Sequence, residues 1–386
     1  MAKSFLKTIS LIVIFSLAPT FLLWLPFFLR IENVFGIPLP KDGMATVVAN
    51  YDGPLYIVVS KTFYDPQAVG EFPFTLPSEY YAAHFPLFPL LIKIFSSFTN
   101  SIYAMLIATI LFSIIGTYYF YLLAKDIVGE KKALWLAFVF SIFPARWLIV
   151  RSVGAAEPMF LAAITASLYY FRRENYWMAG TWGALAQLTK SPGILLFIGF
   201  CISIIIAHFR KTAFASILEA FSLKSLIKTI PLLLIPIALV GVFCLYYFRM
   251  GNFFAYFNSG DNIHLFFPPF QVFNYSQAWV GTFWLEEIIF LYLLGLLGFF
   301  KLVSMKEEKL YCFYAVFLIS LFFVAHRDIL RYGLPIAPLA LIAFHETLTK
   351  KEFKIIFGIL LLPIYLYALT YISQNTMPIT NWSKLI

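Results

Sequence analysis

The sequence has 386 residues, of which 61% are hydrophobic, 20% are aromatic and only 12% are charged, and its mean hydropathy is +0.85. A soluble globular domain carries roughly 25% charged residues, so this composition excludes a soluble protein and predicts a polytopic membrane protein. The formal net charge of +9 is spread over several short basic segments, and this scatter gives no support to nucleic-acid binding.

Apolar runs long enough to cross a membrane recur along the whole chain. Crossing a hydrocarbon core of about 30 Å takes roughly 20 mainly apolar residues. The expected spans lie near residues 8–29, 101–124, 133–150, 156–171, 176–189, 192–208, 229–248, 283–300, 310–325, 333–348 and 355–372. The sequence therefore predicts an all-α integral membrane protein with about eleven transmembrane helices, in which residues 1–386 form a single domain.

The basic residues predict the orientation of these spans. Lys3 and Lys7 flank the first run, which lacks a small-residue cleavage site, so we expect a retained helix with its N-terminus inside. Threading the remaining spans alternately leaves most Lys and Arg residues on the cytoplasmic side and puts the C-terminus outside. Cys201, Cys244 and Cys312 all fall within expected spans, so neither a disulfide framework nor a thiolate metal site is predicted.

Two of the outer connections are long, residues 30–84 and residues 249–282. A long connection in a compact protein is usually functional or disordered, and the aromatic residues of the first one argue against disorder. We therefore expect catalysis in the first outer loop. Both loops are expected to contain interfacial helices. Residues 84–98 should begin a helix on or in the outer interface, since early prolines suit a first helical turn.

Strong polar groups mark the outer ends of the expected helices. Orientation rules explain an excess of Lys and Arg inside, whereas cations kept at the outer ends need a carboxylate or phosphate partner. The polar groups are Asp52, His84, Arg146, Arg151, Glu157, Lys190, Arg249, His326, Arg327 and Arg331. This mixture predicts a site at the outer face of the membrane.

Three of these residues are candidates for proton transfer. Asp52 begins an Asp-Gly-Pro sequence, which also favours a plain turn, and the apolar residues 55–59 are expected to hold it against the outer membrane face. Glu157 precedes a proline at the start of the fourth expected span, where a carboxylate also stabilises a helix N-terminus. His84 is followed by Phe85, and such a histidine is most often an interfacial side chain.

The cations have structural alternatives as well. Arg327 and Arg331 are four residues apart, which places them on one face of any helix. There they either cap that helix or bind a lipid phosphate. Lys190 lies where a short span turns back, and it either snorkels to the interface or belongs to the same phosphate site.

Several short segments match a known pattern. They are Tyr51-Asp52-Gly53, His84-Phe85-Pro86-Leu87-Phe88-Pro89, Ala155-Ala156-Glu157-Pro158, Lys190-Ser191-Pro192-Gly193 and the stretch from Arg327 to Pro338. These segments resemble the motifs of PIG-V-like enzymes (GPI mannosyltransferase 2-like), a mannosyltransferase family of the GT-C superfamily. Residues 45–200 carry most of the resemblance. Tyr51 stands where that family usually has Trp, and Lys190 where it usually has Arg.

The resemblance implies a GT-C-type bundle that transfers one sugar, typically mannose, with inversion. The donor would be a polyprenyl- or dolichyl-phosphate sugar and the acceptor a glycan or glycolipid on the outer face, with Asp52 as the general base and with Glu157 and His84 as further catalytic candidates. The leaving phosphate needs cations rather than an acid, and we expect neither a metal nor a cofactor. The residues expected to bind substrate are Tyr51, Arg151, Lys190, Arg327, Arg331 and Tyr332.

Two other kinds of function compete with an enzyme. A transporter or flippase of lipid-linked sugars would more often show repeats and charges at mid-depth, whereas the charges here gather at the outer ends. An inactive scaffold leaves an outer aspartate opposite a ring of cations unexplained. The chain has only two N-glycosylation sequons, at Asn274 and Asn381, which favours a prokaryotic plasma membrane over the endoplasmic reticulum.

Overall fold

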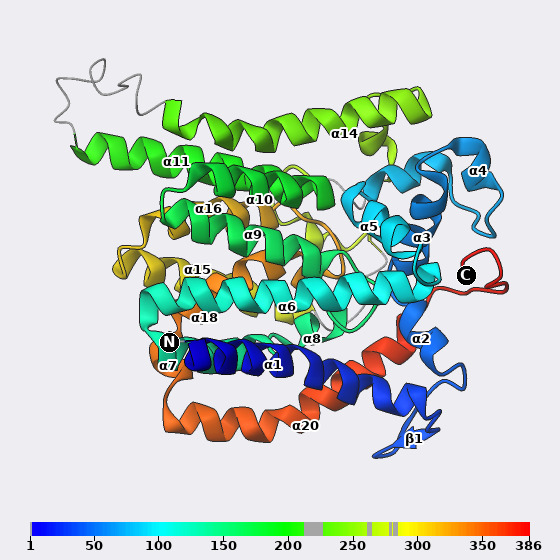
Figure 1. The fold of residues 1–386 in the computed structure, drawn as a ribbon, viewed down its shortest axis with the longest axis horizontal. Helices are drawn as coiled ribbons and strands as arrows, with labels where there is room; N and C mark the ends of the chain where they lie inside the picture. The colour runs from blue at the N-terminus through cyan, green and yellow to red at the C-terminus, as the bar shows by residue number, and fades with distance from the viewer. Residues whose placement is uncertain (1, 212–226, 261–264, 278–279, 281–284) are drawn as a thin grey trace.

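The structure, a computed structural model, describes residues 2–211, 227–260, 265–277, 280 and 285–386. Long helices pack side by side, and the two termini lie at opposite ends of the bundle (Figure 1). The strands found in the described residues are a single short antiparallel pair, β1 (Asn33–Val34) and β2 (Ile37–Pro38). The predicted all-α membrane fold is confirmed.

The elements of the N-terminal half are α1 (Ala2–Phe28), α2 (Met44–Val48), α3 (Gly53–Thr62), α4 (Pro66–Gly70), η1 (Ser78–Ala83), α5 (Leu87–Phe95), α6 (Ser101–Val128), α7 (Glu130–Phe140), α8 (Ala145–Val150), α9 (Glu157–Arg172), α10 (Tyr176–Thr189), η2 (Ser191–Gly193) and α11 (Ile194–Lys211). Those of the C-terminal half are η4 (Ile230–Leu233), α14 (Leu234–Met250), η5 (Ala255–Asn258), η7 (Gln271–Phe273), α15 (Glu286–Ser304), α16 (Glu308–Leu321), α17 (Ile329–Tyr332), η10 (Leu334–Ile336), α18 (Ala337–Ala343), α19 (His345–Leu348) and α20 (Lys351–Gln374).

Six segments among the described residues are long and apolar enough to cross a membrane, and each overlaps an expected span. They are Leu6–Phe28, Ser101–Val128, Ser191–Phe209, Ile227–Met250, Glu286–Ser304 and Lys351–Gln374. The protein is thus a multi-pass membrane protein. The other five expected spans form shorter helices, so the total of eleven stays a prediction.

Two expected spans are interrupted. The run at 133–150 divides into α7 and α8, with residues 141–144 between them. Proline at position 144 explains the break, because proline disfavours helix in the residue before it and cannot donate a backbone hydrogen bond. The run at 333–348 likewise divides into the short elements η10, α18 and α19. Hydropathy alone does not register such breaks.

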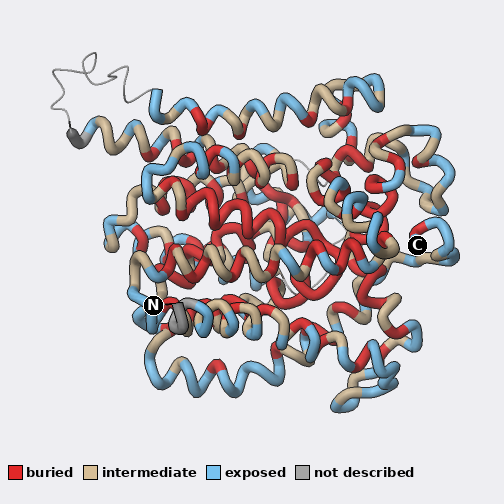
Figure 2. Tube along the Cα trace, viewed as in Figure 1, coloured by how far each residue is buried: buried red, intermediate tan, exposed pale blue. Residues whose placement is uncertain are grey.

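Helix α9 forms the centre of the bundle and is buried on all sides. Every residue from Glu157 to Tyr169 is buried, which is visible as continuous red in the middle of the molecule (Figure 2). Its alanines let the neighbouring helices approach: a Cβ added to Gly116 of α6 would lie 3.4 Å from the Cα of Ala162. Small residues of this kind provide close helix packing in membranes.

The first outer loop folds into α2, α3, α4 and η1 at the end of the bundle that also holds the C-terminus (Figure 1). The helix expected after His84 is confirmed as α5. The buried Asn50 ties the loop to α20, because its Nδ2 donates to the carbonyl of Ile372 at 2.7 Å. The amide of Met377 in turn donates to the carbonyl of Ala49 at 2.7 Å. These bonds hold the segment that carries Tyr51 and Asp52.

One prediction about the outer segments needs correction. Residues 55–59 do not face the membrane: they are buried in α3, where they belong to the core formed with α5 and α6. The interfacial helices expected in 249–282 stay a prediction; the described part of that segment includes the short 3-10 helices η5 and η7. Residues 261–264, 278–279 and 281–284 of that segment lie outside the described chain.

Candidate active site

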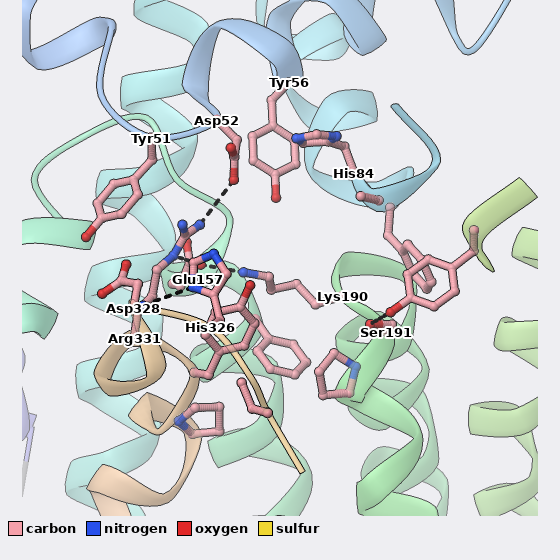
Figure 3. A pocket seen from close by; sticks show the side chains of 18 of the residues that line it. Tyr51, Asp52, Tyr56, His84, Glu157, Lys190, Ser191, His326, Asp328 and Arg331 are labelled. Atoms are coloured by element: carbon pink, nitrogen blue, oxygen red, sulfur yellow. Dashed lines mark hydrogen bonds and ion pairs between the residues drawn. The ribbon is translucent and has the colours of Figure 1, made fainter. Parts of the chain in front are cut away.

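A cavity of about 990 Å³ opens beside the first outer loop. Its wall is built from the Tyr51–Tyr56 region, the loop before α5, the starts of α9 and α11, the α16–α17 connection and the end of α20. Figure 3 shows side chains from these distant segments pointing toward one another. Every residue predicted to be catalytic or to bind substrate lines this cavity, with the exception of Arg151, although the roles assigned to them stay predictions. Arg146 and Arg249, which belong to the wider set of outer polar groups, do not line it.

The backbone around Asp52 directs its carboxylate into the cavity. Tyr51 has a φ of 49°, a left-handed conformation that is uncommon outside glycine. Asp52 occupies the N-cap position of α3, yet its side chain accepts no hydrogen bond from that helix. Its Oδ2 instead lies 3.5 Å from Nη2 of Arg331, and the side chain is 34% exposed. The turn anticipated from Asp-Gly-Pro is present, and it leaves the carboxylate available.

Position 53, directly after Asp52, is glycine for a steric reason. A Cβ added to Gly53 would lie 2.9 Å from the carbonyl oxygens of both Gly154 and Val48, closer than atoms of these types can approach without displacement of the backbone. Glycine here allows the start of α3 to pack directly against the loop that leads into α9. The position of Asp52 relative to Glu157 depends on this contact.

Glu157 organises two cations beneath Asp52. Its Oε1 accepts from Nε of Arg331 at 2.6 Å and also forms an ion pair with Nζ of Lys190. The Glu157 side chain is only 3% exposed, and its Oε2 has no hydrogen-bond partner in the described part of the chain. The group Asp52, Glu157, Lys190 and Arg331 combines two negative and two positive charges. This balance makes burial of the cations tolerable.

A second buried ion pair supports this group from behind. Nε of Arg146 lies 3.2 Å from Oδ1 of Asp328, and its Nη1 donates to the hydroxyl of Tyr51 at 3.3 Å. The guanidinium of Arg331 lies over the ring of Tyr51, 4.2 Å from the ring centroid. Burial raises the pKa of Asp328, and Arg146 opposes that effect. Asp328 was not predicted for the site; its one signal in the sequence is its place between two arginines that are four residues apart.

Two histidines line the cavity in the neutral form. His84 is 3% exposed, its ring packs edge-on to Tyr56, and Nδ1 has no hydrogen-bond partner among the described residues. Burial lowers the pKa of His84. Burial, with help from Arg331, lowers the pKa of His326 to about 4. Nδ1 of His326 accepts from the backbone N–H of Asp328 at 2.9 Å, so any proton on this ring resides on Nε2.

Arg327 and Arg331 do not share a helix face, contrary to the prediction from their spacing. Helix α17 is only four residues long and begins at Ile329, so Arg327 lies in the preceding connection. Arg331 is committed to Glu157 and Asp52, whereas Arg327 is exposed on the cavity wall and has no ion pair within the described residues. Arg327 is therefore a cation available to a ligand. Tyr332 lines the cavity nearby.

Arg151 is not brought to this site. It is fully buried, and its guanidinium donates to the carbonyls of Ser141 at 2.7 Å and Ser16 at 2.8 Å. These bonds tie α1 to the break between α7 and α8. The structure thus gives Arg151 a packing function, while the neighbouring Arg146, which was not predicted for the site, supports Tyr51.

Within the described residues, no group of three or more His, Cys, Asp or Glu side chains is arranged to hold a metal ion. The cavity instead combines buried carboxylates, guanidinium groups and tyrosines. Such an arrangement can accept a proton at Asp52 and can neutralise an anion at its cations.

Comparison of the whole chain with known proteins places its fold. No family model matches the sequence, and no curated protein sequence matches it. Among solved structures, the chain is similar to ArnT from Cupriavidus metallidurans bound to undecaprenyl phosphate, with a TM-score of 0.57 at 14% identity over 91% of this chain and 63% of ArnT.

Archaeal proteins show the same likeness. The oligosaccharyltransferase AglB from Archaeoglobus fulgidus, in complex with an inhibitory peptide and a dolichol-phosphate, matches with a TM-score of 0.52 at 15% identity over 97% of this chain and 57% of AglB. The Archaeoglobus fulgidus oligosaccharyltransferase in complex with Zn and sulfate matches with a TM-score of 0.52 at 16% identity over 96% of this chain and 54% of that one.

These similarities define the class of fold. The protein is a multi-pass membrane protein whose helical bundle has the same fold as the bundles of ArnT and the archaeal oligosaccharyltransferase. It spans between 54% and 63% of the length of these structural neighbours, so the described bundle corresponds to only part of each of them.

Proposed function

We propose that this protein is a membrane glycosyltransferase that moves one sugar from a polyprenyl- or dolichyl-phosphate carrier to a hydroxyl group of a glycan or glycolipid. The observation that carries the proposal is the cavity in which the Asp52 carboxylate lies beside the cations Arg331, Lys190 and Arg327. The fold supports it, since the similar ArnT and AglB structures were determined with undecaprenyl phosphate and dolichol-phosphate.

Asp52 would act as the general base. An acceptor hydroxyl is too weak a nucleophile to attack unaided, and a carboxylate within about 2.6 to 3.2 Å can take its proton as the new bond forms. The acceptor oxygen then bonds to C1 of the sugar, and the bond from C1 to the phosphate oxygen breaks. Attack opposite the departing phosphate inverts the configuration at C1.

The cations would stabilise the leaving group. A polyprenyl-phosphate sugar is a phosphodiester with one negative charge, and transfer releases a phosphomonoester, on which a second charge develops. Donors already oriented toward that position stabilise the developing charge without further reorganisation. Among the described residues, Arg327 is a cavity-lining cation without an ion pair, while Lys190 and Arg331 can share their contacts with Glu157.

The other acidic and basic candidates have subordinate roles in this scheme. Both cations that contact Glu157 do so through one oxygen, so Glu157 holds Lys190 and Arg331 in place and is the reserve candidate for the base. His84 is buried and neutral, with a free Nδ1 among the described residues, and it would contact the substrate by hydrogen bonding. The resemblance to PIG-V-like enzymes supports mannose as the sugar and the extracytoplasmic face as the location.

A transfer assay tests the proposal directly. Purified protein in lipid nanodiscs would be incubated with radiolabelled mannosyl polyprenyl phosphate and a total lipid extract as the source of acceptors. Label should move from an acid-labile glycosyl phosphate into an acid-stable glycoside. A transporter or flippase would instead carry the labelled donor across a liposome membrane and leave its acid-labile linkage intact, which would contradict the enzyme.

A further inference from the structure

We infer that the cavity wall formed by the end of α20 and the residues after it is the acceptor subsite, and that it takes an uncharged carbohydrate. This inference rests on the proposed function, because it assigns the second substrate of the same site. Gln374 and Thr376 carry it. Both line the cavity, both are exposed, and neither side chain has a hydrogen bond within the described residues.

The position of this wall relative to Asp52 follows from its contacts with Tyr51. The backbone N–H of Tyr51 donates to the carbonyl of Asn375 at 3.4 Å, and the rings of Tyr51 and Tyr371 lie 5.7 Å apart. In Figure 3, Tyr51 lies to the left of Asp52, while the Lys190 side chain lies below Asp52 and extends to the right. The α20 wall therefore adjoins Asp52 through Tyr51.

The Lys190 side is suited to the lipid carrier. Lys190 leads directly into Ser191, whose Oγ accepts from the hydroxyl of Tyr256 at 2.8 Å. Beyond it the cavity is lined by apolar side chains, including Leu239 and Phe243 of the candidate span α14. A prenyl chain needs such a surface and a phosphate needs the cation. The donor thus occupies one side of Asp52 and leaves the α20 side for the acceptor.

The chemistry of the α20 wall selects neutral hydroxyl-rich ligands. An amide both donates and accepts, and a hydroxyl does the same, so Gln374 and Thr376 match adjacent hydroxyl groups of a sugar ring. The wall itself contributes no cation, because its lining residues Tyr371, Gln374, Asn375, Thr376, Met377 and Pro378 are all uncharged. An anionic acceptor would therefore meet Asp52 without a free cation from this wall.

The wall is also fixed in place before any ligand binds. Nδ2 of Asn375 donates to Oδ1 of Asn50 at 3.2 Å, Leu385 is fully buried, and Nζ of Lys384 donates to the carbonyl of Glu71. These contacts bind the segment after α20 onto the first outer loop. A preorganised wall loses little conformational freedom on binding.

The experiment measures binding of methyl α-mannoside by saturation-transfer NMR, with the protein in nanodiscs to avoid sugar detergents. We expect the double variant Gln374→Ala/Thr376→Val to bind at least about tenfold more weakly, since two hydrogen bonds are lost. Thr376→Ser keeps the hydroxyl and should bind normally. Ser373→Ala is the matched control, because the Ser373 hydroxyl bonds within α20 to the carbonyl of Leu369.

Three results would overturn the assignment: unchanged binding to the double variant, equal or tighter binding of methyl glucuronide, or displacement of the mannoside by polyprenyl phosphate. In the transfer assay, the double variant should raise the acceptor KM and leave the donor KM unchanged. The binding measurement does not depend on transfer. If no transfer is observed but mannoside binding still depends on Gln374 and Thr376, the proposed function fails while the subsite assignment stands.

Discussion

Glu157 illustrates how one buried residue sets the state of several others. Removing one member of a buried ion pair usually costs about 3 to 5 kcal/mol, because the partner charge stays buried. The Lys190 and Arg331 side chains are 26% and 13% exposed, so we expect Glu157→Gln to lower the unfolding free energy by about 2 to 3 kcal/mol. Thermal unfolding of the two proteins in nanodiscs measures this difference in stability.

The matched control for this prediction is Glu71→Gln, an exposed carboxylate on the first outer loop, which should leave the melting temperature unchanged. A melting temperature equal to that of the wild type in Glu157→Gln would contradict the role of Glu157 as the anchor of the two cations.

His326 makes the stability of the folded protein depend on pH. Its pKa falls from about 6.5 in an unfolded chain to about 4 in the protein because of burial, so below pH 6.5 the unfolded state binds a proton that the folded state does not. The stability contributed by neutral His326 is thus complete above pH 6.5 and is lost as pH falls toward 4. Between pH 6.5 and 5 the loss should reach up to about 2 kcal/mol.

The variant that tests this is His326→Asn, whose Oδ1 can still accept from the N–H of Asp328. Its melting temperature should fall less between pH 7 and 5 than that of the wild type. Equal acid sensitivity of the two proteins would show that His326 is already accessible to protons in the folded state.

Binding and turnover of the donor phosphate should depend on the three cations of the cavity. Replacing Arg327 or Lys190 by Ala removes a charge-assisted hydrogen bond worth roughly 1.5 to 3 kcal/mol, which corresponds to a rise in donor KM or a fall in kcat of about tenfold to 150-fold. Lys41→Ala serves as the control, since that side chain is 85% exposed. Normal turnover with Arg327, Lys190 and Arg331 all replaced would exclude them as the phosphate site.

Individual site residues were predictable to the extent that their sequence neighbourhood was unusual. Asp52, Glu157, Lys190 and Arg331 stand out as charges at the outer ends of apolar runs, and the structure brings all four together. Asp328 was missed because its partner Arg146 is far away in sequence. Only the folded chain distinguishes Arg146, which contacts Tyr51, from Arg151, which does not.

At the scale of elements, the link between α20 and the first outer loop controls the site. Asn50 is fully buried and donates to the carbonyls of Ile372 and Thr46. Asn50→Ala leaves those acceptors without a donor, so we expect a loss of about 1 to 3 kcal/mol. Hydrogen exchange should accelerate at residues 50–56, and transfer should weaken together with it.

Asn33→Ala is the control for this variant, because within the described residues the Asn33 side chain accepts a hydrogen bond only from the exposed amide of Gly36 in the β1–β2 turn. Unchanged exchange at residues 50–56 in Asn50→Ala would show that the loop holds Asp52 without α20.

Hydropathy predicted the positions of most helices and failed where local backbone chemistry prevailed. The long spans at the N- and C-terminal ends agree with their expected positions, since membrane-length apolarity is a property of composition. The break between α7 and α8 and the inward packing of residues 55–59 depend on a proline and on contacts with distant helices. The apolar pattern of a single segment does not predict such contacts.

At the scale of the whole molecule, the orientation in the membrane decides which compartment supplies the substrates. The basic residues predict a cytoplasmic N-terminus, and the termini lie at opposite ends of the bundle (Figure 1). A cysteine at Ser383 should react with an impermeant reagent added from outside, whereas a cysteine at Ser4 should be protected. The reverse pattern would put the cavity on the cytoplasmic side.

The proposed transfer reaction depends on Asp52 as the base. Asp52→Asn keeps the size and hydrogen-bonding capacity of the side chain but removes its ability to take a proton. We expect the purified variant to bind polyprenyl phosphate with wild-type affinity and to transfer sugar at least about a hundredfold more slowly, the low end of what a general base contributes. Near-normal transfer by Asp52→Asn, with transfer abolished in Glu157→Gln, would contradict the account and move the base to Glu157.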